Sequence, residues 1–513
     1  LPPRPFRLAH LTLLMTIRFN RTLSRPPFHL LLGALLAVTL TLAGCDFLDP
    51  TEVENPRTTD EDLARAEEPV SALLPGLRAQ FARALSSTVV VTEFASDNFS
   101  INGTGLGGND LDFPANITPN EATTNSTGQN GSYWNLQELR ALADFVLDEI
   151  APEDDNATDV QLAEAHYYRG MAYLMQGENF VAVPTEEDGA PVAARSLLQE
   201  AAGEFQQARS LGNEEVATWA AAALARTHRA LGNTGEAASF AQTTLQEGGA
   251  DFLYQRLYDG DNLDNDPHDY LVQRSLQEMQ PLPRLDFLDP KYIAEDAGIA
   301  VAKAEEMHLI LAEVALTDSD PGSARSHMID AINIAADRPV VEFNDSDPRF
   351  DNDLNTRPDT SVIEIAFEEG ADFVSGLVLN RPGLVDVPTV SGTHITAGDV
   401  NNASDAELTR LLYLLRQEIL LLEGRRLHDL GIRLPMMLRE IDTNPNISLG
   451  DTGTEVAVPG YIPSGNEMDR YAPVVLYDDN GNLVETQVTI LHDMNRVVAE
   501  QRGLVIENPQ LGQ

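Results

Sequence analysis

The stretch that most constrains the fold of this chain runs from residue 404 to residue 433, SDAELTRLLYLLRQEILLLEGRRLHDLGIR. It opens with Ser404 and, three residues later, Glu407, a capping-box pattern that predicts the start of a helix. Apolar residues then recur at steps of three and four, as on one stripe of a helix: Leu408, Leu411, Leu415, Ile419 and Leu422. Other apolar residues flank this stripe, so we expect more than half of a helix over 405–430 to be buried.

The next residue on the same stripe is Arg426. Glu423 and Asp429 lie three residues to either side of it, within side-chain reach on one helix face, and we expect them to pair with the arginine. Gly424 would let another backbone cross close to the helix, and Gly431 would end it. On spacing alone, the stretch is a salt-bridged core helix that carries no chemistry.

The composition excludes some classes of partner. The chain has 513 residues, 43% of them hydrophobic, which suffices for one large core or two smaller ones. The formal net charge is −46, and lysine occurs only at Lys291 and Lys303. Because the acid excess is spread along the chain and no basic patch could neutralise a phosphate backbone, we expect a solvated acidic surface and no nucleic-acid binding.

The single cysteine, Cys45, is a predicted lipidation site. Arginines precede the apolar run LLLGALLAVTLTL, and the segment ends in LAGC, which matches the lipobox of bacterial lipoproteins. We therefore interpret residues 1–44 as a signal peptide, with the true start at Met15, and residues 45–60 as a lipidated tether. The alternative is an ordinary signal peptide that ends in cysteine. A single cysteine also excludes an internal disulfide.

The remaining sequence predicts a mainly α fold of tetratricopeptide-like helical hairpins, with long irregular loops and a small β-hairpin near the C-terminus. Helical periodicity covers 61–86 in proline-bounded pieces, 136–150, 161–176 ending at Gly177, 214–231 with 236–246, and 304–316 with 324–336. We interpret Thr88–Phe94 as a separate buried segment and 97–131 as an irregular loop, a length that is usually functional or disordered. In the tail, Val474–Tyr477 and Leu483–Ile490 flank an Asn-Gly pair typical of a hairpin turn.

The sequence contains no recognisable catalytic motif. It has no G-x-S-x-G elbow, no H-E-x-x-H and no P-loop, and no two histidines are four residues apart. We therefore predict no catalytic residue, no cofactor and no metal site. Two acid-rich segments, Asp259–Asp266 and Asp345–Asp353, offer oxygen ligands that suit calcium, but they lack EF-hand spacing, so solvated loops are the favoured interpretation.

Aromatic residues beside loops are the candidates for ligand contact, because their faces stack on sugar rings and apolar groups. Five residues that border the 97–131 loop are predicted to bind a ligand: Asp97, Asn98, Phe99, Tyr133 and Trp134. A second aromatic group borders the first acidic segment: Tyr254, Tyr258 and Tyr270. The alternative for Trp134, which opens a helix, is a position in the core. Aromatic residues make up only 6% of the chain, which is few for a starch-type binder, so a peptide ligand stays open.

The order Glu423-Gly424-x-Arg426-x-x-Asp429-Leu430, after a leucine-rich helical run, resembles the C-terminal signature of the SusD/RagB family of nutrient-binding lipoproteins. Residues 161–184, 304–338 and 462–470 are similar to further parts of that family. In the family, the signature marks the fold and binds no ligand. The resemblance implies one helical-repeat domain over 61–513, with ligand loops in 61–270 and the signature helix 405–430 in 271–513.

The resemblance also implies a function and a location. The protein would be anchored by lipid to the outer membrane, face the cell exterior, bind an oligosaccharide or peptide, and pass it to a TonB-dependent SusC-type barrel transporter without doing chemistry. Glu418, one place off the family's usual glutamate, and Gly431, where a basic residue is common, depart from the family pattern. Two other functions remain open: a helical-repeat scaffold lipoprotein that faces the periplasm, and a secreted hydrolase.

Overall fold

The computed structural model describes most of the chain after residue 66. The described residues are 67–101, 111–119, 131–272, 279–344, 362–379, 384–463, 468, 470–473 and 484–509. All of them belong to the second of two compact units, Leu63–Gln513. The predicted signal peptide, the lipidation site Cys45, the tether and the acidic segment Asp345–Asp353 lie outside the described residues.

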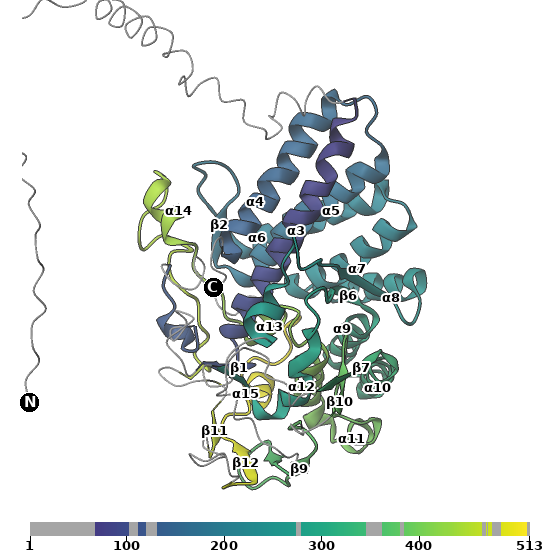
Figure 1. The fold of residues 1–513 in the computed structure, drawn as a ribbon, viewed down its shortest axis with the longest axis vertical. Coiled ribbons are helices and arrows are strands. Elements are labelled where there is room, and N and C mark those ends of the chain that lie inside the picture. The colour runs from purple at the N-terminus through teal and green to yellow at the C-terminus, as the bar shows by residue number, and fades with distance from the viewer. Residues whose placement is uncertain are drawn as a thin grey trace, which may run out of the picture. The chain divides into compact units, whose positions relative to one another are not determined.

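Helices that pack in chain order form most of the described structure, which confirms the prediction of a mainly α fold (Figure 1). The first eight are α3 (Pro69–Phe94), α4 (Ser132–Asp144), α5 (Asp159–Asn179), α6 (Ala194–Leu211), α7 (Glu214–Leu231), α8 (Thr234–Gly248), α9 (Ala304–Thr317) and α10 (Pro321–Asp337). Each packs against the next, most extensively in the pairs α5–α6, α7–α8 and α9–α10. The two hairpins predicted from periodicity are therefore α7–α8 and α9–α10.

Local sequence explains where these hairpins begin and turn. The Asn213 side chain accepts a hydrogen bond from the Val216 amide (3.0 Å) and caps α7. Gly232, with φ at 80°, ends the same helix in the left-handed conformation that glycine adopts without strain. Alanines buried on both sides let the paired helices approach closely: Ala222, Ala225, Ala237, Ala241, Ala312 and Ala324.

The structure differs from the sequence prediction at three points in these helices. Thr88–Phe94 is the C-terminal end of the single long helix α3, which tolerates Pro75 in its second turn at the loss of one helical hydrogen bond. Helix α6 was not predicted at all. Gly177 does not end α5, which continues to Asn179; a Cβ at Gly177 would lie 2.8 Å from Leu198 Cγ and 2.9 Å from the Ala194 carbonyl oxygen, so the glycine is where α6 crosses α5.

Short strands join the helical layers. The strand pairs are β1 (Phe99–Ile101) with β5 (Met279–Pro281), β2 (Ala182–Pro184) with β3 (Pro191–Ala193), β4 (Leu253–Arg256) with β6 (Ile299–Lys303), and β7 (Val340–Asn344) with β10 (Leu384–Pro388), all antiparallel. A four-stranded sheet near the C-terminus has the order β11 (Tyr471–Ala472), β12 (Gln487–Ile490), β8 (Glu364–Ala366), β9 (Val374–Ser375). The antiparallel pair β11–β12 stands in place of the predicted hairpin. Strand β12 falls within the predicted second strand, 483–490, whereas β11 precedes the predicted first strand. Residues 474–477 of that predicted strand lie outside the described part.

The signature stretch is not one helix over 405–430. It comprises a 3₁₀ turn (Asp405–Glu407), α12 (Leu408–Ile419) and the short α13 (Arg426–Leu430). Leu422 (φ 59°) and Gly424 (φ 71°) adopt the left-handed conformation and break the helix between the last two, so Gly424 is required by backbone conformation rather than by a crossing chain. The Ser404 side chain makes no capping hydrogen bond, so the predicted capping box is wrong.

Buried lysines occupy the break. The Lys303 ammonium donates to the Ile419 carbonyl (2.6 Å) and the Lys291 ammonium to the Leu421 carbonyl (2.8 Å). Both also reach Glu423 Oε1 at 2.5 Å. The only two lysines of the chain thus satisfy carbonyl groups that a continuous helix would have paired internally.

Arg426 is buried as predicted, but its predicted partners are wrong. Its guanidinium forms a two-pronged pair with Asp97 (2.6 and 2.7 Å) and donates to Asn495 Oδ1 (2.9 Å). Asp429 instead accepts from Arg416 (2.8 Å) and Arg229 (2.9 Å). Because the helix breaks before Arg426, Glu423 no longer shares its face, and Asp429, although on α13 with Arg426, is engaged by Arg416 and Arg229. The pair with Asp97 is made across 329 residues of sequence.

Candidate functional site

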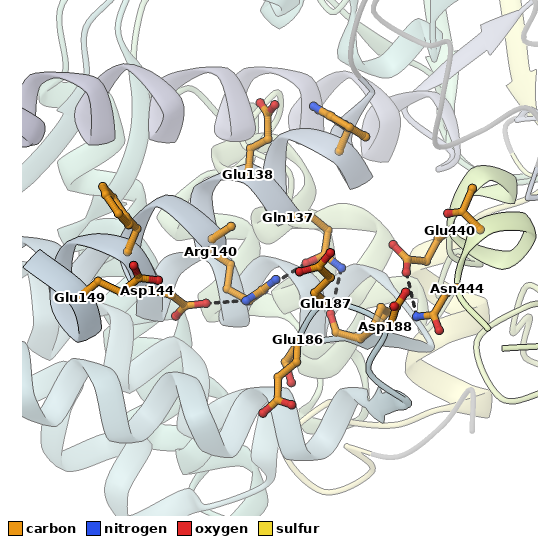
Figure 2. Close-up of a pocket in the computed structure, with 16 residues that line it drawn as sticks. Gln137, Glu138, Arg140, Asp144, Glu149, Glu186, Glu187, Asp188, Glu440 and Asn444 are labelled. Atoms are coloured by element: carbon orange, nitrogen blue, oxygen red, sulfur yellow. Dashed lines mark hydrogen bonds and ion pairs between the residues drawn. The ribbon is translucent and has the colours of Figure 1, made fainter. Parts of the chain in front are cut away.

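A hollow of about 650 Å³ lies between α4, the β2–β3 loop and α14 (Leu438–Thr443), as Figure 2 shows. This volume is within the usual range for sites that bind small molecules. Three segments line it. Trp134, Gln137, Glu138, Arg140, Ala141, Asp144, Phe145 and Glu149 come from α4 and the helical turn after it, Pro184 ends β2 and Thr185, Glu186, Glu187 and Asp188 follow it in the loop, and Glu440 and Thr443 lie on α14 with Asn444 directly after it.

A chain of polar contacts fixes the side chains on the α4 wall. Gln137 Nε2 donates to the Pro184 carbonyl (2.9 Å), and Arg140 Nε donates to Gln137 Oε1 (3.1 Å). Arg140 also pairs with Asp144 (Figure 2). These contacts hold the wall to the β2–β3 loop, so the polar groups are positioned before any ligand arrives.

The opposite wall is tied to the same loop. Asn444 Nδ2 donates to the Gly189 carbonyl (3.0 Å) and to Glu440 Oε1 (3.1 Å). Asn446 Nδ2 donates to the Asp188 carbonyl (2.8 Å). Segments 255 residues apart in sequence therefore form one rim.

The lining of the hollow is acidic and includes two aromatic side chains, Trp134 and Phe145. Seven of the lining residues are acids, against one arginine: Glu138, Asp144, Glu149, Glu186, Glu187, Asp188 and Glu440. Trp134 is half-buried, and the Arg439 guanidinium lies over its ring at 5.2 Å from the centroid, within cation–π range. The hollow thus offers many hydrogen-bond acceptors and an apolar surface, and its charge disfavours anionic ligands.

Two lining or neighbouring groups have displaced pKa values. Burial raises the pKa of the Asp144 carboxyl, although Arg140 and Arg169 oppose the shift. Burial also raises the pKa of Tyr133, whose ring packs edge-to-face on Phe180 with centroids 5.5 Å apart. Asp144 is paired with its two arginines, and Tyr133 is packed in the core. Neither side chain is therefore available to act as an acid or base on a ligand.

The structure places the five predicted ligand residues in different surroundings. Trp134 lines the hollow, and Tyr133 is buried just behind it. Asp97, Asn98 and Phe99 lie in the core, each no more than 1% exposed. Their described contacts are structural: burial alone would raise the pKa of Asp97, but the Arg426 guanidinium holds it below its usual value, and Asn98 accepts from Gln417 (2.7 Å). Ligand contact by these three stays a prediction.

The first acidic segment forms a local turn. Asp259 Oδ1 accepts hydrogen bonds from the amides of Asp261, Asn262 and Leu263 at 2.7–3.1 Å, so this carboxylate caps its own loop. Of the neighbouring tyrosines, Tyr254 stacks on Trp219 (4.0 Å between centroids), and buried Tyr258 donates to the Ala82 carbonyl (2.9 Å). These contacts fix the turn and its neighbouring tyrosines within the fold, and the interpretation of a solvated loop stays a prediction.

Most residues of the hollow were not found by sequence reasoning. Gln137 and Arg140 lie in a helix that was predicted, but nothing in its pattern marks them. Glu186, Glu187 and Asp188 follow the valine-proline of a segment singled out for its resemblance, and Glu440 is on a short helix with no distinguishing motif. The signal that could have found the site is Trp134, one of only two tryptophans.

Comparison with known proteins gave structural likeness only. No family model and no curated protein matches the sequence. A SusD superfamily protein from Bacteroides thetaiotaomicron VPI-5482 is 12% identical, with a TM-score of 0.49 over 74% of this chain and 99% of that one. A putative sugar-binding protein from Bacteroides vulgatus ATCC 8482 is 14% identical, with a TM-score of 0.48 over 74% and 97%.

A laminarin-binding SusD-like protein is 11% identical, with a TM-score of 0.46 over 70% of this chain and 90% of its own. Two of these three structures carry the family name that the sequence resemblance also indicates. At such identities, no residue's role is transferred to this chain. Among the helices of the described residues, none combines the length and hydrophobicity needed to cross a membrane.

Proposed function

We propose that this protein is a SusD/RagB-type lipoprotein that binds a neutral oligosaccharide in the hollow between α4, the β2–β3 loop and α14. The observation that carries the proposal is the pairing of a half-buried tryptophan with a preformed, acceptor-rich rim. Sugar rings stack their apolar faces on aromatic side chains, and sugar hydroxyls donate to carboxylate and amide oxygens. The rim's acids disfavour a charged acidic glycan.

The hollow supports a binding role better than a catalytic one. The lining acid with a raised pKa, Asp144, is engaged by Arg140 and Arg169, so it is not placed to give a proton to a substrate. Asp144 is therefore not a candidate general acid for the secreted-hydrolase alternative. A cationic peptide would also suit the rim's charge, and the binding test below distinguishes it from a glycan.

Removing the Trp134 side chain is expected to weaken glycan binding by about tenfold or more, the loss of roughly 1.4 kcal/mol that one good stacking contact supplies. The measurement is isothermal titration with a panel of neutral glucans, acidic glycans and cationic peptides, first on the wild type and then on Trp134→Ala. Unchanged affinity in Trp134→Ala would place the ligand elsewhere. A response to peptides alone would replace the glycan proposal.

The second tryptophan supplies a matched control. Trp219 stacks on Tyr254 away from the hollow, so Trp219→Phe should keep wild-type affinity. That variant has Trp134 as its only tryptophan, and its fluorescence should change on titration with the ligand. The reciprocal variant, Trp134→Phe, reports from Trp219 and should show no change.

We further propose that the protein is anchored through Cys45 and docks on a TonB-dependent SusC-type barrel. A lipoprotein can hold a ligand but cannot move it across the outer membrane, so capture is useful beside a pore. The sequence supports this through its lipobox and its family resemblance. The packed helical hairpins offer a rigid surface for such docking. The rival function is a scaffold lipoprotein in the periplasm.

Affinity purification from detergent-solubilised outer membranes is expected to recover a large barrel protein in about one-to-one ratio with the wild type. Cys45→Ser, which lacks the acylated thiol, should appear in the soluble fraction, because stable anchoring depends on the attached lipid chains. Retention of Cys45→Ser in washed membranes would contradict lipid anchoring. Recovery of the wild type alone under several mild detergents would favour the scaffold function.

A further inference from the structure

The α9–α10 hairpin brings together two histidines and an aspartate that are far from the hollow in sequence. His308 lies on α9, and His327 and Asp330 lie three residues apart on α10. His308 Nδ1 is 3.2 Å from His327 Nδ1 and 3.7 Å from Asp330 Oδ2. One ligand atom from each of the three lies within 4.8 Å of the others, the single such group among the described residues.

The two distances from His308 Nδ1 are close to the edges of a tetrahedral metal site. With Zn–N bonds of about 2.0–2.1 Å and Zn–O bonds of about 2.0–2.2 Å, ligand atoms of a tetrahedron stand roughly 3.3–3.5 Å apart. His308 Nδ1 is near that spacing from His327 Nδ1 (3.2 Å) and from Asp330 Oδ2 (3.7 Å), and the ligand atoms of His327 and Asp330 lie within 4.8 Å of each other. Without a metal, two neutral histidines could make only one hydrogen bond between their facing Nδ1 atoms, with one ring as donor and the other as acceptor. Asp330 would then remain outside hydrogen-bond range of His308.

The surroundings suit an ion that arrives from solvent. All three residues are partly buried, with side-chain exposures of 14% for His308 and 48% for Asp330. His308 and His327 lie on helices packed against each other, whereas the Asp330 side chain is about half exposed to solvent.

We propose that His308, His327 and Asp330 bind one zinc ion that joins α9 to α10. Imidazole and carboxylate donors suit late first-row divalent metals, and a three-ligand site with an open position is a common zinc arrangement. Sequence reasoning did not find this site, because the histidines are 19 residues apart and come together only through the hairpin. The bound ion would fasten this part of the helical stack and stabilise the folded state by mass action.

Zinc titration of the untagged mature protein tests the proposal. Metal-stripped protein, held in mild detergent, is titrated with zinc against a chromophoric chelator, and its melting temperature is followed with and without zinc. We expect one zinc per chain and a higher melting temperature. His308→Ala, His327→Ala and Asp330→Asn should each weaken binding on the order of tenfold or more, since even outer-shell changes cost 10–100-fold.

Control variants separate this site from adventitious binding. His166→Ala and His492→Ala remove partly buried histidines elsewhere and should leave zinc affinity and the melting shift unchanged. Cobalt substitution gives a second readout, since the visible bands of tetrahedral cobalt should appear in wild type and be lost in His327→Gln. Equal zinc affinity in wild type and in all three ligand variants, or no saturable binding to the wild type, would overturn the proposal.

Discussion

Replacing Glu423 with glutamine is expected to lower the free energy of unfolding by at least about 3–5 kcal/mol, the usual cost of removing one partner from a buried ion pair. Glu423 Oε1 accepts from the Lys291 and Lys303 ammonium groups, both at 2.5 Å. The three side chains are at most 3% exposed, so water cannot take the place of the carboxylate. Glu423→Gln leaves two buried ammonium groups without the carboxylate that pairs directly with both.

The two lysines differ in the hydrogen-bond acceptors, other than Glu423, that surround their ammonium groups. Lys303 also reaches the Ser391 hydroxyl (2.8 Å) and the Ile419 carbonyl (2.6 Å). Burial lowers the pKa of Lys291 to about 8 despite the nearby Glu423. Losing Glu423, which raises the pKa of Lys291, should lower it further, so Lys291 should become neutral near neutral pH in this variant.

Denaturant unfolding of Glu423→Gln against the wild type measures the loss. The control is Glu138→Gln, which removes an exposed carboxylate from α4 and should change stability by less than about 0.5 kcal/mol. The variant Lys291→Met/Lys303→Met/Glu423→Leu removes all the charges and should recover much of the stability. A Glu423→Gln protein within about 0.5 kcal/mol of the wild type would show that this carboxylate does not neutralise the lysines.

Sequence periodicity predicted the helical hairpins well, because an amphipathic helix carries its burial pattern in its own residues. Helix α7 begins and ends at Glu214 and Leu231, as expected from its alanine-rich run and its glycine turn. Periodicity did not predict the positions at which the backbone leaves the helical conformation. Leu422 adopts a positive φ although leucine rarely does, and tertiary contacts to Lys291, Lys303 and Tyr292 compensate for the break.

Partners distant in sequence could not be predicted. The sequence showed that Arg426 lies on a buried stripe and must be paired, but many of the 80 acidic residues could have supplied the carboxylate. The candidate site shows the same limit. Trp134 was identified from its chemistry, whereas Glu187 and Glu440 reach the hollow only because α14 folds back on the β2–β3 loop.

Replacing Arg426 with alanine is expected to destabilise the fold by roughly 3–5 kcal/mol, because Asp97 would remain as a buried, unpaired carboxylate. Asp97 is 1% exposed and receives two charged hydrogen bonds from Arg426, at 2.6 and 2.7 Å, and one from Gln417 at 3.0 Å. Two parallel bonds of this kind are the strongest arrangement that an arginine and a carboxylate form. The pair also joins the end of α3 to α13.

The pH dependence of the same variants tests the pair independently. The pKa of Asp97 is lowered in the folded state because Arg426 outweighs the effect of burial. The ion pair therefore stabilises fully above the unfolded-state pKa of about 3.9, and the contribution is lost as the pH falls through the lower folded-state pKa. The stability difference between wild type and Asp97→Asn should be largest near neutral pH and shrink in acid.

A double-mutant cycle of Arg426→Ala and Asp97→Asn, measured by chemical denaturation near neutral pH, isolates the interaction between the two side chains. We expect a coupling of at least about 2 kcal/mol, since each single change removes most of what the other would remove. Arg496→Ala is the matched control: Arg496 pairs with Glu368 at 2.9 Å but is 30% exposed, so its loss should cost no more than about 1 kcal/mol. If Arg426→Ala costs no more than Arg496→Ala, the pair with Asp97 does not hold α3 to α13, and the stability of the signature region depends on the lysines and Glu423 instead.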